Sequence, residues 1–310
     1  MDEPTPAALT PAQQRTLDLI KRAPEPVVFD EELVEHLVDT ATSELARLSE
    51  LLQGESLWVS KGFLAKVHGC EVRHLAPDDF EWRPAIAAGF VAHKAIELSL
   101  NWRGEPEPGV VVDEALARFA DQADARGAYV GGLSDGDWAE LRSRAIDRTT
   151  KFLQDFPPLP LSAHPVLEAA AKWRPAGTIE LSGKVDLVVG KPSGRESRLL
   201  IIDFKSGSHS FHHRDDLRFY ALVQTLRQRV PPRKLVTYYL DYAEGEAEDV
   251  TEGILEASLA RALEGIERHI ELTVQDRPPV KRVGVACRWC PLQAECPEGI
   301  AFLATAAADS

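Results

Sequence analysis

Two aspartates and a lysine near the middle of the chain have the residue types and spacing of a metal-dependent hydrolytic site. Asp186 lies in one strand-like segment, and Asp203 and Lys205 lie two positions apart in the next. Side chains at i and i+2 of a strand point to one face, so Asp203 and Lys205 should project together. If the turn between the segments centres on residues 194–195, Asp186 lies directly across from Asp203, and opposed side chains sit about 5 Å apart.

Two carboxylates this close repel each other unless a positive charge lies between them. A divalent cation is the natural partner, because Mg²⁺ and Mn²⁺ prefer oxygen ligands and keep water molecules for chemistry. Asp186 and Asp203 would be ligands, together with the carbonyl of Phe204, and Lys205 would assist the attacking water or stabilise charge on a phosphate. The plain alternative is a solvated Asp–Lys ion pair, which is common on strand surfaces. The alignment of Asp186 favours a site.

The segment that carries these residues reads as a β-hairpin. Residues 178–189 alternate apolar and polar side chains, residues 191–196 have the composition of a turn, and residues 199–204 are apolar. Further helices are expected at 212–228 and 251–271, and another strand at 235–241.

The part of the chain before the hairpin has helical periodicity. Helices are expected at about 13–22, 29–53, 85–100, 112–125 and 135–154. The 85–100 segment places Phe90, His93 and Glu97 on one face. This order predicts an α/β or α+β core with a mixed central sheet flanked by helices, a helical N-terminal region and a loop-like, cysteine-rich C-terminal tail.

Four cysteines form the second chemical pattern. Cys287, Cys290 and Cys296 have the spacing C-x₂-C-x₅-C, and Cys70 lies far upstream. Thiolates held this closely in a reducing compartment indicate metal ligands and not disulfides. Four of them suit a 4Fe–4S cluster or Zn²⁺. Zinc sites usually consist of two close pairs, whereas here a single cysteine lies far upstream of a triplet; coincidental buried thiols are the plain alternative.

Composition restricts the protein class only weakly. The chain has 310 residues, with 49 acids and 35 bases, a net charge of −14. This charge predicts weak affinity for DNA without a divalent metal, since phosphate binding depends on Lys and Arg. The sequence has no apolar run long enough for a membrane span and no basic and apolar leader, so a cytoplasmic protein is expected.

The hairpin motifs resemble the PD-(D/E)xK nuclease superfamily in its RecB-like branch. Residues 183–189 (GKVDLVV) look like the strand with the first acid, and residues 203–207 (DFKSG) look like the D/E-x-K strand. The resemblance implies a restriction-endonuclease-like core. Residues 89–97 (GFVAHKAIE) are similar to the branch's histidine motif, which implies that His93 is a metal ligand and makes Mn²⁺ as suitable as Mg²⁺. A lone histidine on an apolar helix face is otherwise usually a core residue.

A further motif of the branch, Gln-x-x-x-Tyr, corresponds here to residues 216–220. Tyr220 is retained, which implies a role in catalysis or in supporting the site, whereas Asp216 replaces the glutamine. Glu180, on the same strand face as Asp186, is either a supporting acid or a solvated residue.

The cysteine distribution is similar to that of AddB nuclease domains and CRISPR-associated RecB-like exonucleases, and residues 58–70 resemble their segment before the first cysteine. The implied organisation is an N-terminal helical extension over 1–57, a nuclease domain with an iron–sulfur staple over 58–300, and a tail over 301–310.

The resemblance implies an exonuclease that acts on single-stranded DNA ends in repair or recombination, with a helicase or repair protein as partner. Two alternatives are a non-catalytic iron–sulfur subunit of a helicase–nuclease complex and a CRISPR spacer-acquisition nuclease. Trp289 is expected to pack in the core or to stack on a base. The candidate phosphate contacts are Lys184, Arg214, Arg218 and Arg282, with Lys281 and Arg288 as further basic residues.

Overall fold

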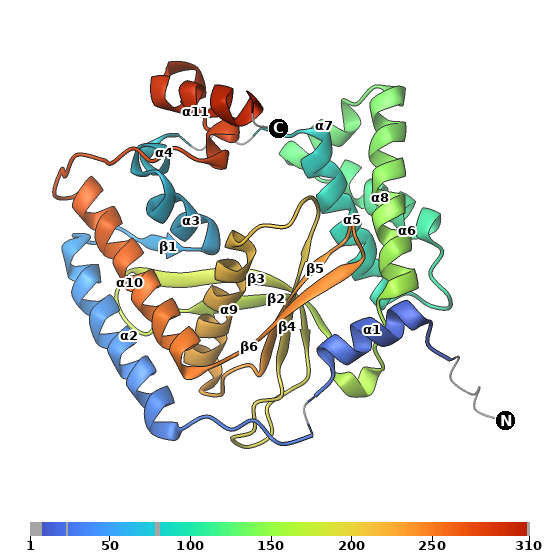
Figure 1. Cartoon of the computed structure of the whole chain (residues 1–310), viewed down its shortest axis with the longest axis horizontal. Helices are drawn as coiled ribbons and strands as arrows, with labels where there is room; N and C mark the ends of the chain where they lie inside the picture. The colour runs from blue at the N-terminus through green and yellow to red at the C-terminus, as the bar shows by residue number, and fades with distance from the viewer. Residues whose placement is uncertain (1–7, 23, 78–80, 309–310) are drawn as a thin grey trace.

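A single mixed β-sheet forms the centre of the molecule (Figure 1). The computed structural model describes residues 8–22, 24–77 and 81–308. Within them the sheet has six strands, of which β4 and β5 are parallel neighbours and β3 is antiparallel to both β2 and β4. The strands are β1 (Leu57–Val59), β2 (Val166–Trp173), β3 (Ile179–Val189), β4 (Leu200–Lys205), β5 (Lys234–Tyr239) and β6 (Glu244–Asp249).

The hairpin of β3 and β4 has the alignment that the sequence predicts. Leu187 pairs with Ile202 and Val189 with Leu200, so the next position along brings Asp186 opposite Asp203. The turn depends on Gly190, whose φ is +96° and whose missing Cβ would lie 2.6 Å from the Arg198 carbonyl oxygen. Only glycine fits both constraints without strain.

Helices cover both faces of the sheet and enclose a core on each. One face packs against α2 (Glu31–Leu51), α9 (His212–Gln228) and α10 (Glu252–Thr273). The other face packs against α1 (Pro11–Ile20), α5 (Pro84–Leu100) and α8 (Asp135–Asp155). Alternate strand residues point to opposite faces, which is why the apolar strand β4 is buried on both.

A smaller helical cluster extends from one side of the sheet. Helices α6 (Pro108–Ala120) and α7 (Ala125–Gly131) join α5 and α8 around a separate apolar core. Helix α5 therefore belongs to two cores, and its position is fixed from both sides.

The N-terminal helix α1 is anchored by a buried arginine. Arg233 donates hydrogen bonds to the carbonyl oxygens of Ile20 (2.5 Å) and Lys21 (3.2 Å), where α1 ends. These carbonyls have no partner within the helix, and a cation suits their negative end of the helix dipole.

The predicted fold class is confirmed: a mixed sheet lies between helices, with helices at the N-terminus. The sequence analysis missed β2, which pairs with β3 along most of its length. It also missed the short helices α3 (Lys61–Gly69) and α4 (Glu71–Leu75), and it was wrong about the end of the chain, where α11 (Pro297–Ala308) follows two turns of 3₁₀ helix. Strand β2 contains Leu167, Glu168, three alanines and Lys172, all residue types with a high intrinsic helix propensity. Pairing of the segment with β3 overrides this propensity. None of the described helices is long and apolar enough to cross a membrane.

Candidate active site

The site lies at a break along one edge of β3. Strand β1 pairs in parallel with the start of β3, through Leu57, Trp58 and Val59. Strand β4 pairs with the end of β3, while β2 occupies the opposite edge. The edge between β1 and β4 is therefore open around Asp186, and the residues that follow β1 and β4 are brought towards it.

Asp203 and Lys205 are in contact, as their two-residue spacing predicts. The Asp203 side chain is only 2% exposed, and Lys205 Nζ lies 2.7 Å from its Oδ2 atom. The intervening Phe204 points the other way, into the aromatic core with Phe152 and Tyr238. Packing of Phe204 therefore holds the Asp203–Lys205 face in place.

A second lysine, which the sequence analysis missed, completes this arrangement. Lys61 Nζ lies 3.0 Å from Asp203 Oδ1 and 3.5 Å from Asp216 Oδ2. It is the first residue of α3, whose N-cap Ser60 accepts a hydrogen bond from Phe63 N at 3.1 Å. Serine directly after a short apolar strand is an N-cap pattern, and it was the available sign that a helix begins there.

The two lysines set the charge state of Asp203. Burial disfavours the ionised carboxylate, but attraction to Lys61 and Lys205 outweighs burial and lowers the pKa of Asp203. Burial likewise disfavours the charged form of Lys61, yet Asp203, Tyr220 and Asp216 together raise its pKa. Asp203 and Lys61 are therefore both charged at neutral pH.

Asp186 links the hairpin to helix α5. Its Oδ2 atom accepts a hydrogen bond from Phe204 N at 2.7 Å, and its Oδ1 atom lies 3.5 Å from His93 Nδ1. Burial lowers the pKa of His93, but the nearness of Asp186 has the larger combined effect, so the pKa is raised. The sequence-predicted residues His93, Asp186, Asp203 and Lys205 are thus connected by a continuous series of contacts.

Asp216 and Tyr220, from helix α9, lie on the other side of the lysines. Lys205 Nζ donates to Asp216 Oδ2 at 2.9 Å, so the aspartate that replaces the expected glutamine binds the site lysine directly. Tyr220 is buried below Lys61, whose Nζ lies 5.1 Å from the ring centroid. Burial raises the pKa of Tyr220 to about 12. A side chain at Gly183 would collide with this ring, since a Cβ there would lie 2.4 Å from Tyr220 Cε1.

Glu168 is a further acid that the sequence analysis missed. The pairs Leu167–Leu187 and Ala169–Val185 place it beside Asp186. Its φ of +50° is unusual for a residue other than glycine, and strained backbone of this kind concentrates at functional sites. Its side chain forms an ion pair with Lys184.

The donor set suits a hard divalent cation. Asp203 Oδ2 is buried, and its contact within the described residues is with Lys205 Nζ at 2.7 Å. Carboxylate oxygens and an imidazole nitrogen are the ligands of Mg²⁺ and Mn²⁺ sites. Within residues 8–22, 24–77 and 81–308, however, no three His, Cys, Asp or Glu side chains are gathered closely enough to hold a metal ion.

The C-terminal cysteine segment lies against the start of α4. Glu71 is buried; its Oε1 and Oε2 atoms accept hydrogen bonds from Arg277 at 2.9 and 3.0 Å, and Oε2 also accepts from Val280 N at 2.8 Å. Glu71 N donates to the Val280 carbonyl at 3.2 Å. Cys70 directly precedes Glu71, so this pairing brings the chain's distant segment next to Cys70.

Cys287 and Cys296 lie near each other at the far end of the same segment. A Cβ on Gly299 would lie 3.4 Å from Cys296 Sγ and 3.7 Å from Cys287 Sγ, so these two sulfurs are neighbours. Cys70, Cys287, Cys290 and Cys296 are all partly buried and form no disulfide.

Most of the basic residues proposed to contact phosphates are engaged with protein acids or carbonyls. Arg218 binds Glu248, Arg214 Nη2 lies 3.6 Å from Glu246, and Arg282 Nη1 donates to the His68 carbonyl at 3.2 Å; Lys184 pairs with Glu168. Glu180 pairs with Arg174 at 3.0 Å. The expectation that Trp289 packs in the core was wrong, because its side chain is 56% exposed.

Solved structures give only distant similarities. A protein from Eubacterium rectale, named as a candidate exonuclease, is 11% identical with a TM-score of 0.46, over 77% of this chain and 87% of that one. The protein SSO0001 is 13% identical with a TM-score of 0.28, over 76% of this chain and 95% of that one. Scheffersomyces stipitis Rai1 is 14% identical with a TM-score of 0.25, over 81% and 69% of the two chains.

Family membership rests on the sequence itself. No curated protein matches the chain. The family profile of the PD-(D/E)XK nuclease superfamily, in contrast, matches residues 63–297, which include His93, the complete β3–β4 hairpin and the three C-terminal cysteines. The chain therefore belongs to the PD-(D/E)XK nuclease superfamily.

Proposed function

We propose that the protein hydrolyses phosphodiester bonds of DNA with the help of Mg²⁺ or Mn²⁺. The observation that carries this proposal is the alignment of Asp186 with Asp203 on neighbouring strands, with His93 and Lys205 in contact with them. His93, Asp186 and Asp203 would hold the cation, with the Phe204 carbonyl as a further ligand and Glu168 close by. A bound divalent cation supplies Lewis acidity towards the phosphate and lowers the pKa of water.

The two lysines provide the positive charge that phosphoryl transfer requires. Lys61 and Lys205 both lie within about 3 Å of Asp203, so an approaching phosphate would meet two ammonium groups. Lys205, held between Asp203 and Asp216, is placed to orient the attacking water or to stabilise the charge that grows on the phosphate oxygens. Asp216 and Tyr220 keep the lysines in position.

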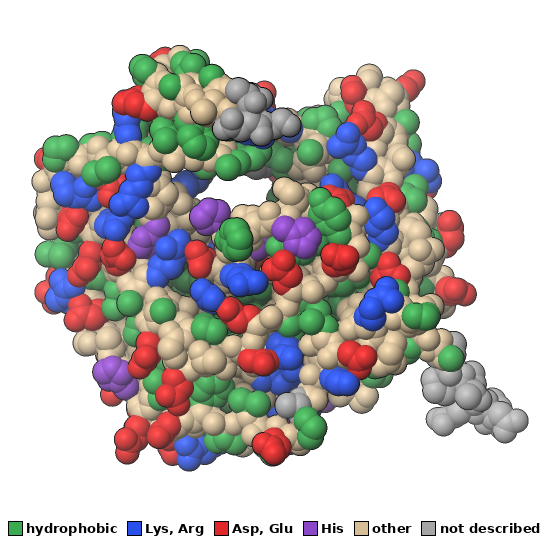
Figure 2. Space-filling model, in the orientation of Figure 1, with side chains coloured by type: hydrophobic (Ala, Val, Ile, Leu, Met, Phe, Trp, Pro, Cys, Tyr) green, Lys and Arg blue, Asp and Glu red, His purple; other side chains and the backbone are tan. Residues whose placement is uncertain are grey.

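We propose single-stranded ends as the substrate, with mononucleotides or short fragments as products. Exposed aromatic rings beside the D-x-K strand support this choice, because unpaired bases stack on such rings without regard to sequence. Phe211 is 88% exposed and Tyr242 is 52% exposed, and His209 stacks on Tyr239 with ring centroids 3.8 Å apart. Figure 2 shows an opening below the C-terminal helix, bordered by histidine and apolar side chains, through which a strand with a free end can enter.

We further propose that Cys70, Cys287, Cys290 and Cys296 hold a 4Fe–4S cluster, with Zn²⁺ as the alternative. The pairing of Glu71 with Val280 next to Cys70, and the closeness of Cys287 to Cys296, support a shared site. Such a site would fasten the end of the chain to α4 and contribute its binding energy to folding. An anaerobic visible spectrum with iron and zinc analysis distinguishes the two metals.

The test of hydrolysis uses labelled single-stranded DNA with Mn²⁺. The wild-type protein should degrade it, and Asp203→Asn and Lys205→Ala should lower the rate by at least about a hundredfold, the usual range for loss of a catalytic group. Glu180→Gln is the matched control, because it removes an acid from β3 that pairs with surface bases.

Two results would contradict the proposal. If wild-type protein binds the strand without cutting it, the protein is instead a non-catalytic subunit that works with a helicase. If the two site variants cut at the wild-type rate, hydrolysis occurs elsewhere.

We also propose that residues 58–300 form the nuclease domain, with residues 1–57 as an extension and 301–310 as a tail.

A further inference from the structure

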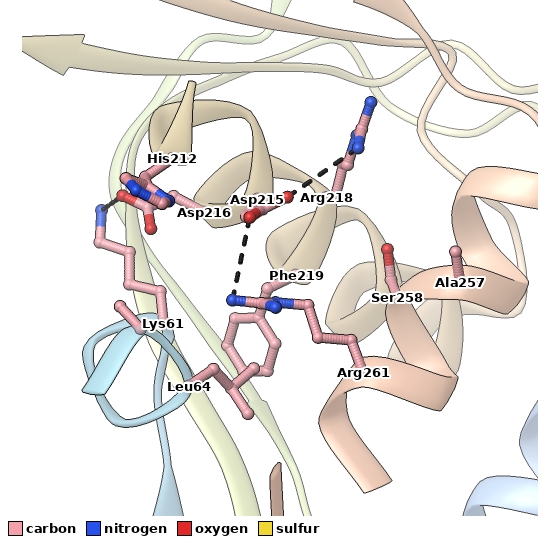
Figure 3. A pocket seen from close by; sticks show the side chains of 11 residues that line it. Lys61, Leu64, His212, Asp215, Asp216, Arg218, Phe219, Ala257, Ser258 and Arg261 are labelled. Atoms are coloured by element: carbon pink, nitrogen blue, oxygen red, sulfur yellow. Dashed lines mark ion pairs between the residues drawn. The ribbon is translucent and has the colours of Figure 1, made fainter. Parts of the chain in front are cut away.

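A groove beside the proposed active site has a chemistry of its own. It lies between α3, α9 and α10 and is open to solvent (Figure 3). Lys61 and Asp216 belong both to its wall and to the cluster around Asp203. The groove therefore begins where the scissile phosphate would lie and leads away from it.

The floor of the groove is apolar. Leu64 and Phe219 form it and are almost fully buried, while Ala65 and Ala257 line the walls with small, exposed side chains. Small wall residues leave room for a flat group to reach the floor.

The rim carries a basic side chain with only a loose partner. Arg261 Nη2 lies 3.8 Å from Asp215 Oδ2, beyond hydrogen-bonding distance. Figure 3 shows its guanidinium above Phe219, between α9 and α10. Arg218, in contrast, binds Glu248 through two nitrogens, one of them Nε at 2.8 Å, and is committed to the fold.

The acids of the groove do not oppose an anionic ligand. Asp216 is neutralised by Lys205 at 2.9 Å and Lys61 at 3.5 Å. Asp215 lies between Arg218 and Arg261, at 3.9 and 3.8 Å. Arg261 is thus the loosely paired cation of the groove, at a distance from the two site lysines.

We propose that this groove is the subsite for the nucleotide next to the cleaved bond. Its base or sugar packs on Leu64 and Phe219, its scissile phosphate lies at Lys61, and the phosphate beyond it is bound by Arg261. A nucleotide strand is the occupant that provides an apolar ring between two phosphates. An uncharged peptide or a hydrocarbon chain would leave Lys61 and Arg261 without an anion. This proposal rests on the proposed function, since it takes Lys61 as the position of the cleaved phosphate.

The test measures binding without hydrolysis. A fluorescent oligothymidylate is titrated with protein in EDTA, and its anisotropy gives the dissociation constant at low salt. Arg261→Gln removes the second phosphate contact, and Ala257→Leu fills the wall without changing charge. We expect each to weaken binding about tenfold. Both positions are partly or fully exposed, so the fold should survive, and unchanged thermal unfolding checks this.

Arg268→Gln is the matched control. Arg268 lies on the same helix seven residues further on, about 10 Å away, and is paired with Glu264. It should bind the oligonucleotide as the wild type does. Thymidine 5′-monophosphate should compete more weakly in Ala257→Leu than in wild type, whereas inorganic phosphate should compete equally in both.

The outcomes separate this subsite from the hydrolytic function. Weakened binding in Arg261→Gln and Ala257→Leu, in a protein that cuts no DNA, supports nucleotide binding in the groove and contradicts hydrolysis. Normal cleavage with wild-type binding in both variants contradicts the subsite and leaves hydrolysis in place. Equal weakening in Arg268→Gln would mean that only net charge matters and would also overturn the subsite.

Discussion

Replacement of Glu71 by Gln should release the C-terminal cysteine segment while leaving the sheet folded. Glu71 is buried and accepts three hydrogen bonds, two from Arg277 and one from Val280 N, all of 2.8–3.0 Å. Glutamine keeps the shape but loses the charge and can accept at only one oxygen. The Arg277 side chain and the backbone of the segment that follows it then have weaker contacts with α4.

The magnitude follows from the exposure of the two partners. Removing one member of a buried ion pair typically costs about 3–5 kcal/mol. Arg277 is 32% exposed and keeps its 2.8 Å contact with Glu271, so its charge stays solvated and the lower end applies. About 3 kcal/mol corresponds to roughly a hundredfold change in an equilibrium. Local opening of residues 279–296 should become more frequent by about that factor.

Hydrogen–deuterium exchange measures this opening directly. The protein is kept in reducing buffer with a chelator, so that only side-chain contacts hold the segment. Amides of residues 279–296 should exchange about a hundredfold faster in Glu71→Gln, while those of β4 and β5 stay unchanged. Glu271→Gln is the control, because an exposed partner contributes below about 1 kcal/mol. Equal exchange in Glu71→Gln and wild type would refute the role given to this carboxylate.

Two further predictions concern stability. Burial, with His269 nearby, lowers the pKa of His74 to about 4, whereas the value in the unfolded chain is about 6.5. Between these two pH values the unfolded chain binds more protons than the folded protein, so the stability of the fold should decrease as the pH drops from about 6.5 to about 4. In a series of urea unfolding midpoints measured against pH, His74→Phe should flatten this part of the profile. A profile unchanged by the substitution would contradict this assignment. Arg148 is buried against Asp241, whose carboxylate also accepts a hydrogen bond from Gly207 N at 2.6 Å. Arg148→Met should therefore destabilise the fold by about 3 kcal/mol, which would be measured as a lower thermal midpoint and as faster amide exchange at residues 206–208. An unchanged midpoint would contradict a stabilising role for the contacts of Asp241 with Arg148 and Gly207.

The hairpin could be predicted because its two strands constrain each other. Alternation fixes which side of β3 carries Asp186, and the turn composition fixes the alignment with Asp203. The helices that carry His93 and Tyr220 could be predicted in outline too. The face expected on the helix with His93 was less accurate, because Phe90 is 45% exposed and the alanine-rich side of the helix is the buried one.

The missed features depend on contacts between distant segments. Lys61 reaches Asp203 only because β1 pairs in parallel with the start of β3, and a three-residue strand has too few positions for a periodic pattern. Glu168 lies in an alanine-rich segment that favours helix, and its role follows from pairing with β3. The buried bond between Glu71 and Arg277 joins segments that have no common motif.

Helix α3 connects the cluster around Asp203 with Cys70. It is nine residues long, about 13 Å, with Lys61 at its first position and Cys70 as its C-cap. A helix this short transmits a displacement without bending, and it is packed against α9 and α10. Alkylation or oxidation of the Cys70 thiol that shifts the last turn would move the Lys61 ammonium relative to Asp203. Chemical damage to the Cys70 thiol would therefore reach the surroundings of Asp203 through one short helix.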